Sequence, residues 1–364
     1  MTAQGDITPI LQEWWLPLSW PLASDRFVVQ VYDADVGRDE HVASMFFSLK
    51  DLVQKGSAPA GYYYWQNLYG APKGYSGEAV DKMNENPEFG SAWLGRCLIH
   101  IECTAAKHPE RREQAVAGDV KQQAIDLGLF TQNEYEIIAE LGLGICLPGY
   151  ENYTVKIQIG DFVLRSAAPM ESRQGYCRWS ERINMTTFKS FYSTPEQMDR
   201  IYVYLMSGEV PICWWKGQVT EFLDPNPQYR WLVLKNDAAI GTVVNDYDAG
   251  MIQMKLALNA KHLNGPVDFK QYDAWKRPPP RRLATKKVRC FIFQCRDIPA
   301  GDEDGQSDAY VTVWNPSGDD HSTKVMEKNL NPIFFETVEM EYEMSDIANS
   351  PPIVINMWDK DDSS

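Results

Sequence analysis

Residues 298–311 read Ile-Pro-Ala-Gly-Asp-Glu-Asp-Gly-Gln-Ser-Asp-Ala-Tyr-Val, and they separate two apolar segments of the chain. The segments on either side, Val288 to Cys295 and Tyr310 to Trp314, are short and rich in β-branched and aromatic residues, as strands are. The quoted stretch is therefore an acidic loop between two predicted strands. We expect it to lie at one rim of a β-sandwich.

A second acidic loop, Asp359-Lys-Asp361, follows a later predicted strand, Ile353 to Trp358. Its Asp-x-Asp spacing points two carboxylates the same way, because alternate residues share a face. Calcium takes about six to eight oxygen ligands, which flexible carboxylate loops supply. Two such loops at one end of a sandwich predict a calcium site. The alternative is that these aspartates only cap turns.

The bulk composition restricts the functions that are open to this chain. It has 364 residues, 44% apolar residues and a formal net charge of −15. Two or three globular domains fit this length, and the negative charge makes nucleic acid an unfavourable partner. The sequence has neither an apolar run long enough to span a bilayer nor a signal peptide. We therefore expect any membrane role of these residues to be peripheral.

The seven cysteines are scattered, and none forms a CxxC pair or a Cys/His cluster with zinc spacing. Several of them occupy apolar positions of predicted strands. We interpret them as buried reduced thiols, which predicts a reducing compartment, the cytosol.

Period-two alternation of apolar and polar residues recurs along the chain and predicts antiparallel sandwiches. Clear examples are residues 97–103, 153–159 and 252–258. We expect a mainly β chain with three modules, residues 1–104, 150–261 and 287–364, of which the first and the last look incomplete. Residues 105–149 form a predicted helical linker, because Glu134 to Leu141 and the segments before it are rich in good helix formers.

The second predicted linker, residues 262–286, is basic and proline-rich, with Lys276-Arg-Pro-Pro-Pro-Arg-Arg near its end. Consecutive prolines favour an extended polyproline conformation. The basic residues could touch anionic lipid, or the segment could be a solvated, semi-rigid spacer.

The third module resembles the C2 domain in the Asp302…Gly305-x-Ser307-Asp308-x-Tyr310-Val311 block, the Asn331-Pro332 turn and the Trp358-Asp359-x-Asp361 loop. The resemblance implies that Asp302, Asp308, Asp359 and Asp361 bind calcium. In the family, one more acidic ligand usually follows, and it would fall beyond Ser364. Ala309 replaces the usual proline of the first loop.

The first module has a similar strand and loop, Arg26 to Asp39, so the resemblance implies half a calcium site at Asp33, Asp35 and Asp39. The corresponding loop of the middle module lacks the Asp-x-Asp pair. We therefore expect the middle module to be independent of calcium, and we interpret Asp246-Tyr-Asp248 as a solvated turn.

Further motifs resemble the ferlins, which are large multi-C2 proteins with a membrane anchor that act in vesicle fusion and membrane repair. These motifs are Glu13-Trp-Trp-Leu-Pro, Leu68-Tyr-Gly-Ala-Pro72, Met83-Asn-Glu-Asn-Pro87, Arg178-Trp-Ser-Glu-Arg182 and Arg200-Ile-Tyr-Val-Tyr-Leu. The resemblance implies an internal fragment of a membrane-anchored parent, peripheral on the cytosolic face of membranes.

Three functions remain to be compared. The favoured one is calcium-dependent docking on anionic phospholipid membranes during vesicle fusion, trafficking or repair. The second is a calcium-independent scaffold that binds other proteins, for example through the middle module. The third, an enzyme, is disfavoured because the sequence has no G-x-S-x-G, no glycine-rich phosphate loop and no HExxH motif.

Overall fold

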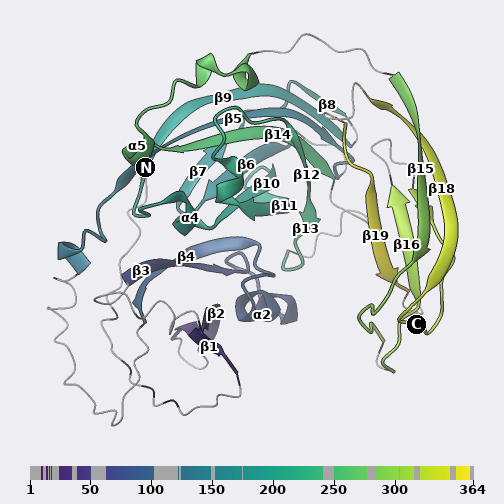
Figure 1. Ribbon diagram of the computed structural model, residues 1–364, viewed down its shortest axis with the longest axis horizontal. Coiled ribbons are helices and arrows are strands. Elements are labelled where there is room, and N and C mark those ends of the chain that lie inside the picture. The colour runs from purple at the N-terminus through teal and green to yellow at the C-terminus, as the bar shows by residue number, and fades with distance from the viewer. Residues whose placement is uncertain are drawn as a thin grey trace.

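The computed structural model is built from antiparallel strands and very little helix (Figure 1). It describes residues 24–34, 39–50, 63–101, 124–148, 152–173, 175–240, 250–276, 284–302, 304–314, 320–344 and 350–360, and the single residues Ile10, Trp14, Leu16, Leu18 and Gln122. The predicted fold class, mainly β with tandem antiparallel sandwiches, is confirmed. No helix in these ranges is long and apolar enough to cross a membrane.

The middle sandwich, residues 133–260, is made of two five-stranded sheets with the orders β13-β11-β10-β6-β7 and β12-β14-β5-β9-β8. The strands of the first sheet are β6 (Thr154–Ile159), β7 (Phe162–Arg165), β10 (Arg200–Ser207), β11 (Val210–Gln218) and β13 (Lys235–Asn236). Those of the second are β5 (Asn133–Ile145), β8 (Glu171–Arg173), β9 (Tyr176–Ser190), β12 (Arg230–Val233) and β14 (Met251–Ala260).

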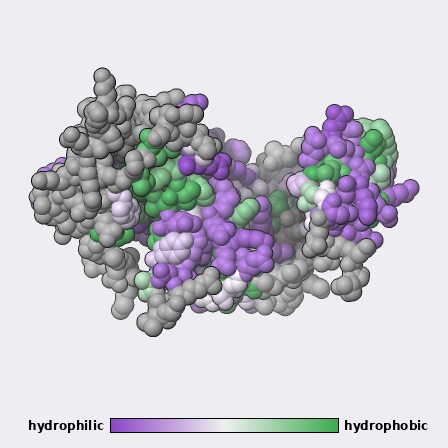
Figure 2. Space-filling model, turned by 90° about the horizontal axis from the view of Figure 1, so that it is seen from below, coloured by the Kyte–Doolittle hydropathy of each residue, from purple (hydrophilic) through white to green (hydrophobic). Residues whose placement is uncertain are grey.

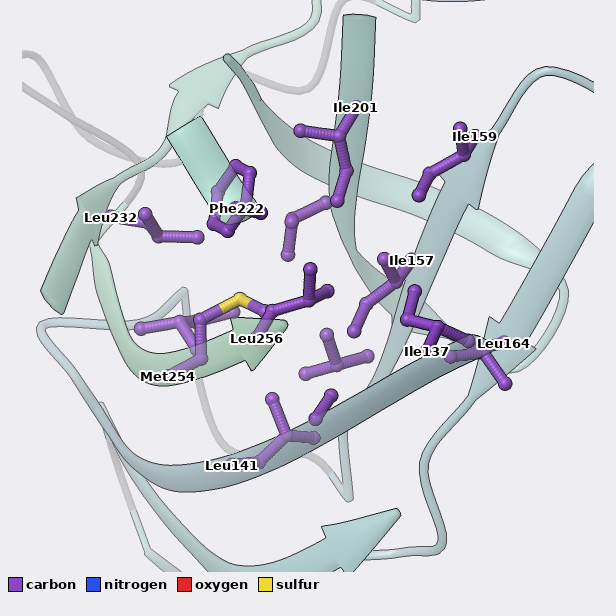
Figure 3. Packing of buried hydrophobic residues seen from close by; sticks show 14 of the residues in the cluster. Ile137, Leu141, Ile157, Ile159, Leu164, Ile201, Phe222, Leu232, Met254 and Leu256 are labelled. Carbon is purple, nitrogen blue, oxygen red and sulfur yellow. The ribbon is translucent and has the colours of Figure 1, made fainter. Parts of the chain in front are cut away.

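The core of this sandwich lies between the two sheets, and its side chains point toward one another in Figure 3. In β6, Val155, Ile157 and Ile159 are buried while the residues between them are half-buried. This is the pattern that period-two alternation predicts. Two short helical segments, α4 (Pro195–Met198) and η1 (Val219–Phe222), close the same core with Met198 and Phe222.

The first module, residues 1–104, contains two hairpins and the helix α2 in its described part, and the described residues 49–50 begin a further helical segment. The hairpins are β1 (Arg26–Asp33) with β2 (Glu40–Ser48), and β3 (Tyr63–Gly70) with β4 (Ala92–His100), and α2 (Glu78–Glu85) lies between β3 and β4. The two hairpins share one apolar cluster around Ala43, Met45 and Leu68. They therefore pack face to face.

The first module also packs against the middle sandwich through an aromatic cluster. Tyr69 of β3 joins Tyr202, Tyr204 and Trp214 of the middle sandwich in one buried group. The Tyr202 and Tyr204 hydroxyls donate hydrogen bonds to the carbonyls of Gly90 and Ser91, at 3.1 and 2.8 Å. This contact explains why β10 is buried on both faces.

Two arginines reinforce this contact, which we call the module interface. Arg200 donates to the Pro87 carbonyl at 2.6 Å, forms an ion pair with Glu88 and lies 4.5 Å from the ring centroid of Tyr69. Arg96 donates two hydrogen bonds to the Asp161 carboxylate at 3.2 and 3.3 Å. The interface thus ties together segments that lie 112 residues apart in the chain at Arg200 and Glu88, and 65 residues apart at Arg96 and Asp161.

The predicted helix at Glu134 to Leu141 is wrong, because these residues belong to β5 at the centre of a sheet. Tyr135, Ile137, Ala139 and Leu141 face the core, and Ile138 on the other face is buried as well. Apolar residues occur on both faces of this strand, so the sequence does not show a clear alternation. Burial in the sheet outweighs the helix propensity of glutamate, alanine and leucine. Residues 124–126 are helical, whereas residues 102–121 lie outside the described part.

The predicted linker at residues 262–286 is only partly a linker. Residues 261–275 form α5 (Lys261–Asn264) and the 3-10 turns η2 (Phe269–Gln271) and η3 (Asp273–Trp275). Phe269 and Trp275 cover Ile138 and Ala257 on the outer face of the second sheet. The proline-rich residues 277–283 lie outside the described part of the chain.

The third module, residues 287–364, begins with β15 (Ala284–Gln294), which starts just before the predicted boundary. β15 pairs with β18 (Ile333–Met344), and a second sheet has the order β17 (Asp320–Ser322), β16 (Ala309–Trp314), β19 (Val354–Asp359). The two sheets enclose a small core around Val313, Val338 and Met340.

Candidate metal centre

One end of the third module gathers the loops that carry the predicted calcium ligands. The loop that follows β15 is held against the turn before β18, where Cys295 N–H donates to the Pro332 carbonyl at 2.9 Å and Ile298 N–H to the Leu330 carbonyl at 3.1 Å. β16 begins and β19 ends at the same place, since Ala309 pairs with Asp359. The strand ends therefore bring both acidic loops to one rim.

The first acidic loop is folded by its own hydrogen bonds. Asp302 N–H donates to the Gln306 carbonyl at 3.1 Å, and Gly305 N–H donates to the Asp302 carbonyl at 3.1 Å. Gly305 has a φ of +80°, which glycine adopts at little cost. The buried Ser307 hydroxyl donates to the Pro299 carbonyl at 2.9 Å and accepts from Gly301 N–H at 2.8 Å. The loop thus presents Asp302 from a fixed backbone.

Asp308 and Asp359 meet at this rim. Asp308 N–H donates to Oδ1 of Asp359 at 2.6 Å, and Lys360 N–H donates to the Asp308 carbonyl at 3.0 Å. Oδ1 of Asp308 accepts from Lys328 N–H at 2.8 Å. Both carboxylates are half-buried, and each is oriented by a backbone N–H group.

Gly301 brings the first loop against the second. A Cβ atom on Gly301 would collide with Oδ2 of Asp359. Any larger residue at position 301 would therefore displace the Asp359 side chain from its present position beside the first loop. The sequence interpretation missed Gly301, and it also missed Lys328, whose Nζ lies 3.5 Å from Oδ2 of Asp304. No residue pattern pointed to either of them.

The donor chemistry of the rim fits a hard cation such as calcium, because the predicted ligands are carboxylate oxygens that adjacent loops supply. Asp308 and Asp359 are in contact and Asp302 stands next to Gly301, whereas Asp361 lies outside the described residues. Among the described residues, no three His, Cys, Asp or Glu side chains already stand in a metal-holding arrangement.

The second predicted set of ligands lies at the tip of the first hairpin. Asp33 ends β1 opposite Glu40, and Asp39 directly precedes β2. Both aspartates are exposed, and Asp35 lies outside the described residues. The structure thus brings Asp33 and Asp39 to one hairpin end.

The middle sandwich uses its acidic residues differently. The Asp161 carboxylate binds Arg96 across the module interface. Asp237 is buried beside the interface, and this burial raises the pKa of its carboxyl, although the Ala239 N–H, which donates to Oδ1 at 3.0 Å, partly opposes the shift. No sequence pattern pointed to Asp237. Asp246 and Asp248 lie outside the described residues.

Comparison with known proteins supports the interpretation of the third module. A model of the C2 domain matches residues 286–364, which confirms the predicted resemblance there. Among solved structures, one that holds the SMP domain and the two C2 domains of extended synaptotagmin 2 is similar at 12% identity and a TM-score of 0.24, over 63% of this chain and 46% of that chain. This chain therefore spans less than half the length of that structure.

Two further solved structures are similar at comparable levels. The calcium-bound pair of C2 domains of extended synaptotagmin 2 matches at 12% identity and a TM-score of 0.25, over 62% of this chain and 79% of that one. A single C2 domain of a plant extended synaptotagmin 1 matches at 13% identity and a TM-score of 0.25, over 34% of this chain and 94% of that one.

Proposed function

We propose that the third module binds phospholipid membranes in a calcium-dependent manner through Asp302, Asp308, Asp359 and Asp361. The observation that carries this proposal is the contact of Asp308 with Asp359 at the rim where both acidic loops end. The match of residues 286–364 to the C2 domain supports it.

The mechanism follows from the charge of the chain. The four aspartates make the rim negative within a chain of net charge −15, so the rim repels anionic lipid. Bound calcium would supply compensating positive charge and open coordination positions for lipid phosphate or carboxylate oxygens. The backbone N–H groups of Asp308 and Lys328 orient the carboxylates for this role.

The finer assignment rests on the ferlin-like motifs. We propose that this chain is part of a ferlin-like protein that acts in vesicle fusion, membrane trafficking or repair on the cytosolic face of membranes. In this proposal the three modules are tandem C2-type domains, the parent carries a membrane anchor, and these residues have no enzymatic activity. Asp33, Asp35 and Asp39 would form a second, partial site.

Calcium titration by calorimetry tests the proposed site, with Asp302→Asn and Asp359→Asn as variants. We expect calcium binding by the wild type and weaker binding by each variant. In Asp359→Asn the asparagine keeps an oxygen that can accept the N–H of Asp308, so the fold of this variant should persist. The absence of binding heat from the wild type would contradict the proposal.

A calcium-independent protein scaffold is the second candidate, and the module interface favours it. There, the outer face of a C2-like sandwich already holds another folded segment through Tyr202 and Tyr204. Sedimentation with phosphatidylserine vesicles separates the two functions. Pelleting only in calcium supports membrane docking, whereas equal pelleting with and without calcium, or none, supports the scaffold.

A further inference from the structure

The outer face of β15 and β18 carries an exposed aromatic patch, which consists of Phe291, Phe293, Ile333 and Phe335. Their exposed fractions are 56, 59, 51 and 74%. The rings are in contact, with centroids 6.3 Å apart for Phe291 and Phe293 and 6.1 Å apart for Phe293 and Phe335. The three rings therefore form one continuous apolar surface, and Ile333, two residues before Phe335 in β18, adds a further exposed apolar side chain.

The strand register explains why these residues face outward. In β15, Val288, Cys290 and Ile292 pack on the core, so Phe291 and Phe293 point to the opposite face. A register shift lies between Ile292 and Gln294, and Phe335 has a φ of +47°. Such a conformation is costly for a bulky residue. The strain favours a function for the exposed ring over an accident of packing.

The aromatic patch lies at the same end of the module as the acidic rim. Phe293 is two residues before Cys295, whose backbone N–H donates a hydrogen bond to the Pro332 carbonyl. Asp297 N–H donates to the Asn331 side chain at 3.1 Å. Figure 2 views the molecule from below, and hydrophobic surface borders the hydrophilic surface of the third module there. A flat partner that reaches the rim would therefore also meet the patch.

We infer that the aromatic patch contacts the headgroup and acyl boundary of the lipid bilayer to which the rim docks, an inference that rests on the proposed function. Side chains of this size with these exposures offer roughly 400–500 Å² of surface in total. That is well below the ~800 Å² per partner of a stable protein interface. A surface of this size is sufficient for apolar side chains to enter a lipid interface when an electrostatic contact nearby also holds the protein there.

The charges next to the patch fit this occupant. Farther along the same face, Arg289 forms an ion pair with Glu339. Nζ of Lys287 lies 3.6 Å from a carboxylate oxygen of Glu339 and 3.6 Å from one of Glu341. The positive charge of these strands is thus largely compensated. The charges of this face therefore attract anionic lipid only weakly. The contribution of the aromatic patch to membrane binding is then mainly hydrophobic.

Vesicle sedimentation of the full chain tests the inference with the double variant Phe293→Thr/Phe335→Asn. Threonine suits a strand, and asparagine tolerates the positive φ at residue 335. The matched control is Met170→Ser/Leu263→Ser, which removes two comparably exposed apolar side chains from the middle sandwich and its α5 helix. Vesicles contain phosphatidylcholine and phosphatidylserine, with calcium or with chelator.

We expect the aromatic variant to bind calcium alone like the wild type and to bind vesicles in calcium about ten-fold more weakly or worse. The control should match the wild type. Wild-type vesicle affinity in the aromatic variant would overturn the inference. So would a variant that loses only self-association, because a second copy would then occupy the patch.

The same experiment separates this inference from the proposed function. Vesicle binding that ignores calcium but requires the aromatic residues would support the patch and overturn the calcium mechanism. No vesicle binding by the wild type in either condition would overturn both.

Discussion

Replacement of Arg200 by alanine should weaken the module interface by about 2–3 kcal/mol. The side chain is 9% exposed and binds the Pro87 carbonyl, the Glu88 carboxylate and the face of Tyr69. Two hydrogen bonds at about 1–2 kcal/mol each and a cation–π contact of about 1 kcal/mol give about 3–5 kcal/mol. Desolvation of the guanidinium offsets part of this gain.

The loss should stay below the value for a fully buried pair, because Glu88 is 67% exposed and returns to water when Arg200 is removed. Arg165→Ala is the matched control. Arg165 and its partner Glu209 are 45% and 83% exposed, so this ion pair should contribute less than about 1 kcal/mol.

Urea unfolding, monitored by tryptophan fluorescence, measures the free energy of unfolding. Hydrogen exchange shows which strands are destabilised. In Arg200→Ala the amides of β3 and β4 should exchange faster, whereas Arg165→Ala should leave them unchanged. The reasoning is refuted if the free energy of unfolding of Arg200→Ala lies within about 0.5 kcal/mol of the wild-type value and hydrogen exchange in β3 and β4 is unchanged.

Three further outcomes follow from individual residues. Burial holds the pKa of Asp237 above its unfolded value, so its ionisation destabilises the fold as pH rises through the folded pKa. Asp237→Asn should therefore raise the melting temperature at pH 7, and this gain should vanish as the pH falls toward the unfolded pKa. Gly301→Ala should lower both calcium affinity in calorimetry and thermal stability, because the added Cβ collides with Asp359. Burial raises the pKa of the Cys213 thiol, which should resist a thiol reagent at pH 8 until the protein is unfolded.

The strands that face one core could be predicted from the sequence. The alternation at residues 153–159 and 252–258 corresponds to β6 and β14. The apolar run at 310–314 corresponds to β16. In β6 the fully buried residues lie on one face, and β16 is short. β14 is buried on both faces, but its outer positions hold Gln253, Lys255 and Ala257, so large apolar residues still alternate with polar or small ones in the sequence.

Features that depend on contacts between distant segments could not be predicted. Ile138 of β5 is apolar because residues 266–276 fold back over it, and that cover is invisible in the local pattern. The module interface has the same origin, since Arg200 and Glu88 meet only in three dimensions. At the rim, the resemblance to the C2 domain implied that Asp308 and Asp359 lie together, whereas the close approach of Gly301 to the Asp359 side chain needed coordinates.

The module interface also has a consequence for synthesis of the chain. Asn67 of the first module donates to the Met198 carbonyl, 131 residues later in the chain. At about 5–20 residues per second, a ribosome needs roughly 7–26 seconds to make that distance. During this time Tyr69 and its neighbours on β3 and β4 have left the exit tunnel without the strand that covers them. This interval makes the nascent first module a natural client for chaperones that hold exposed aromatic surface.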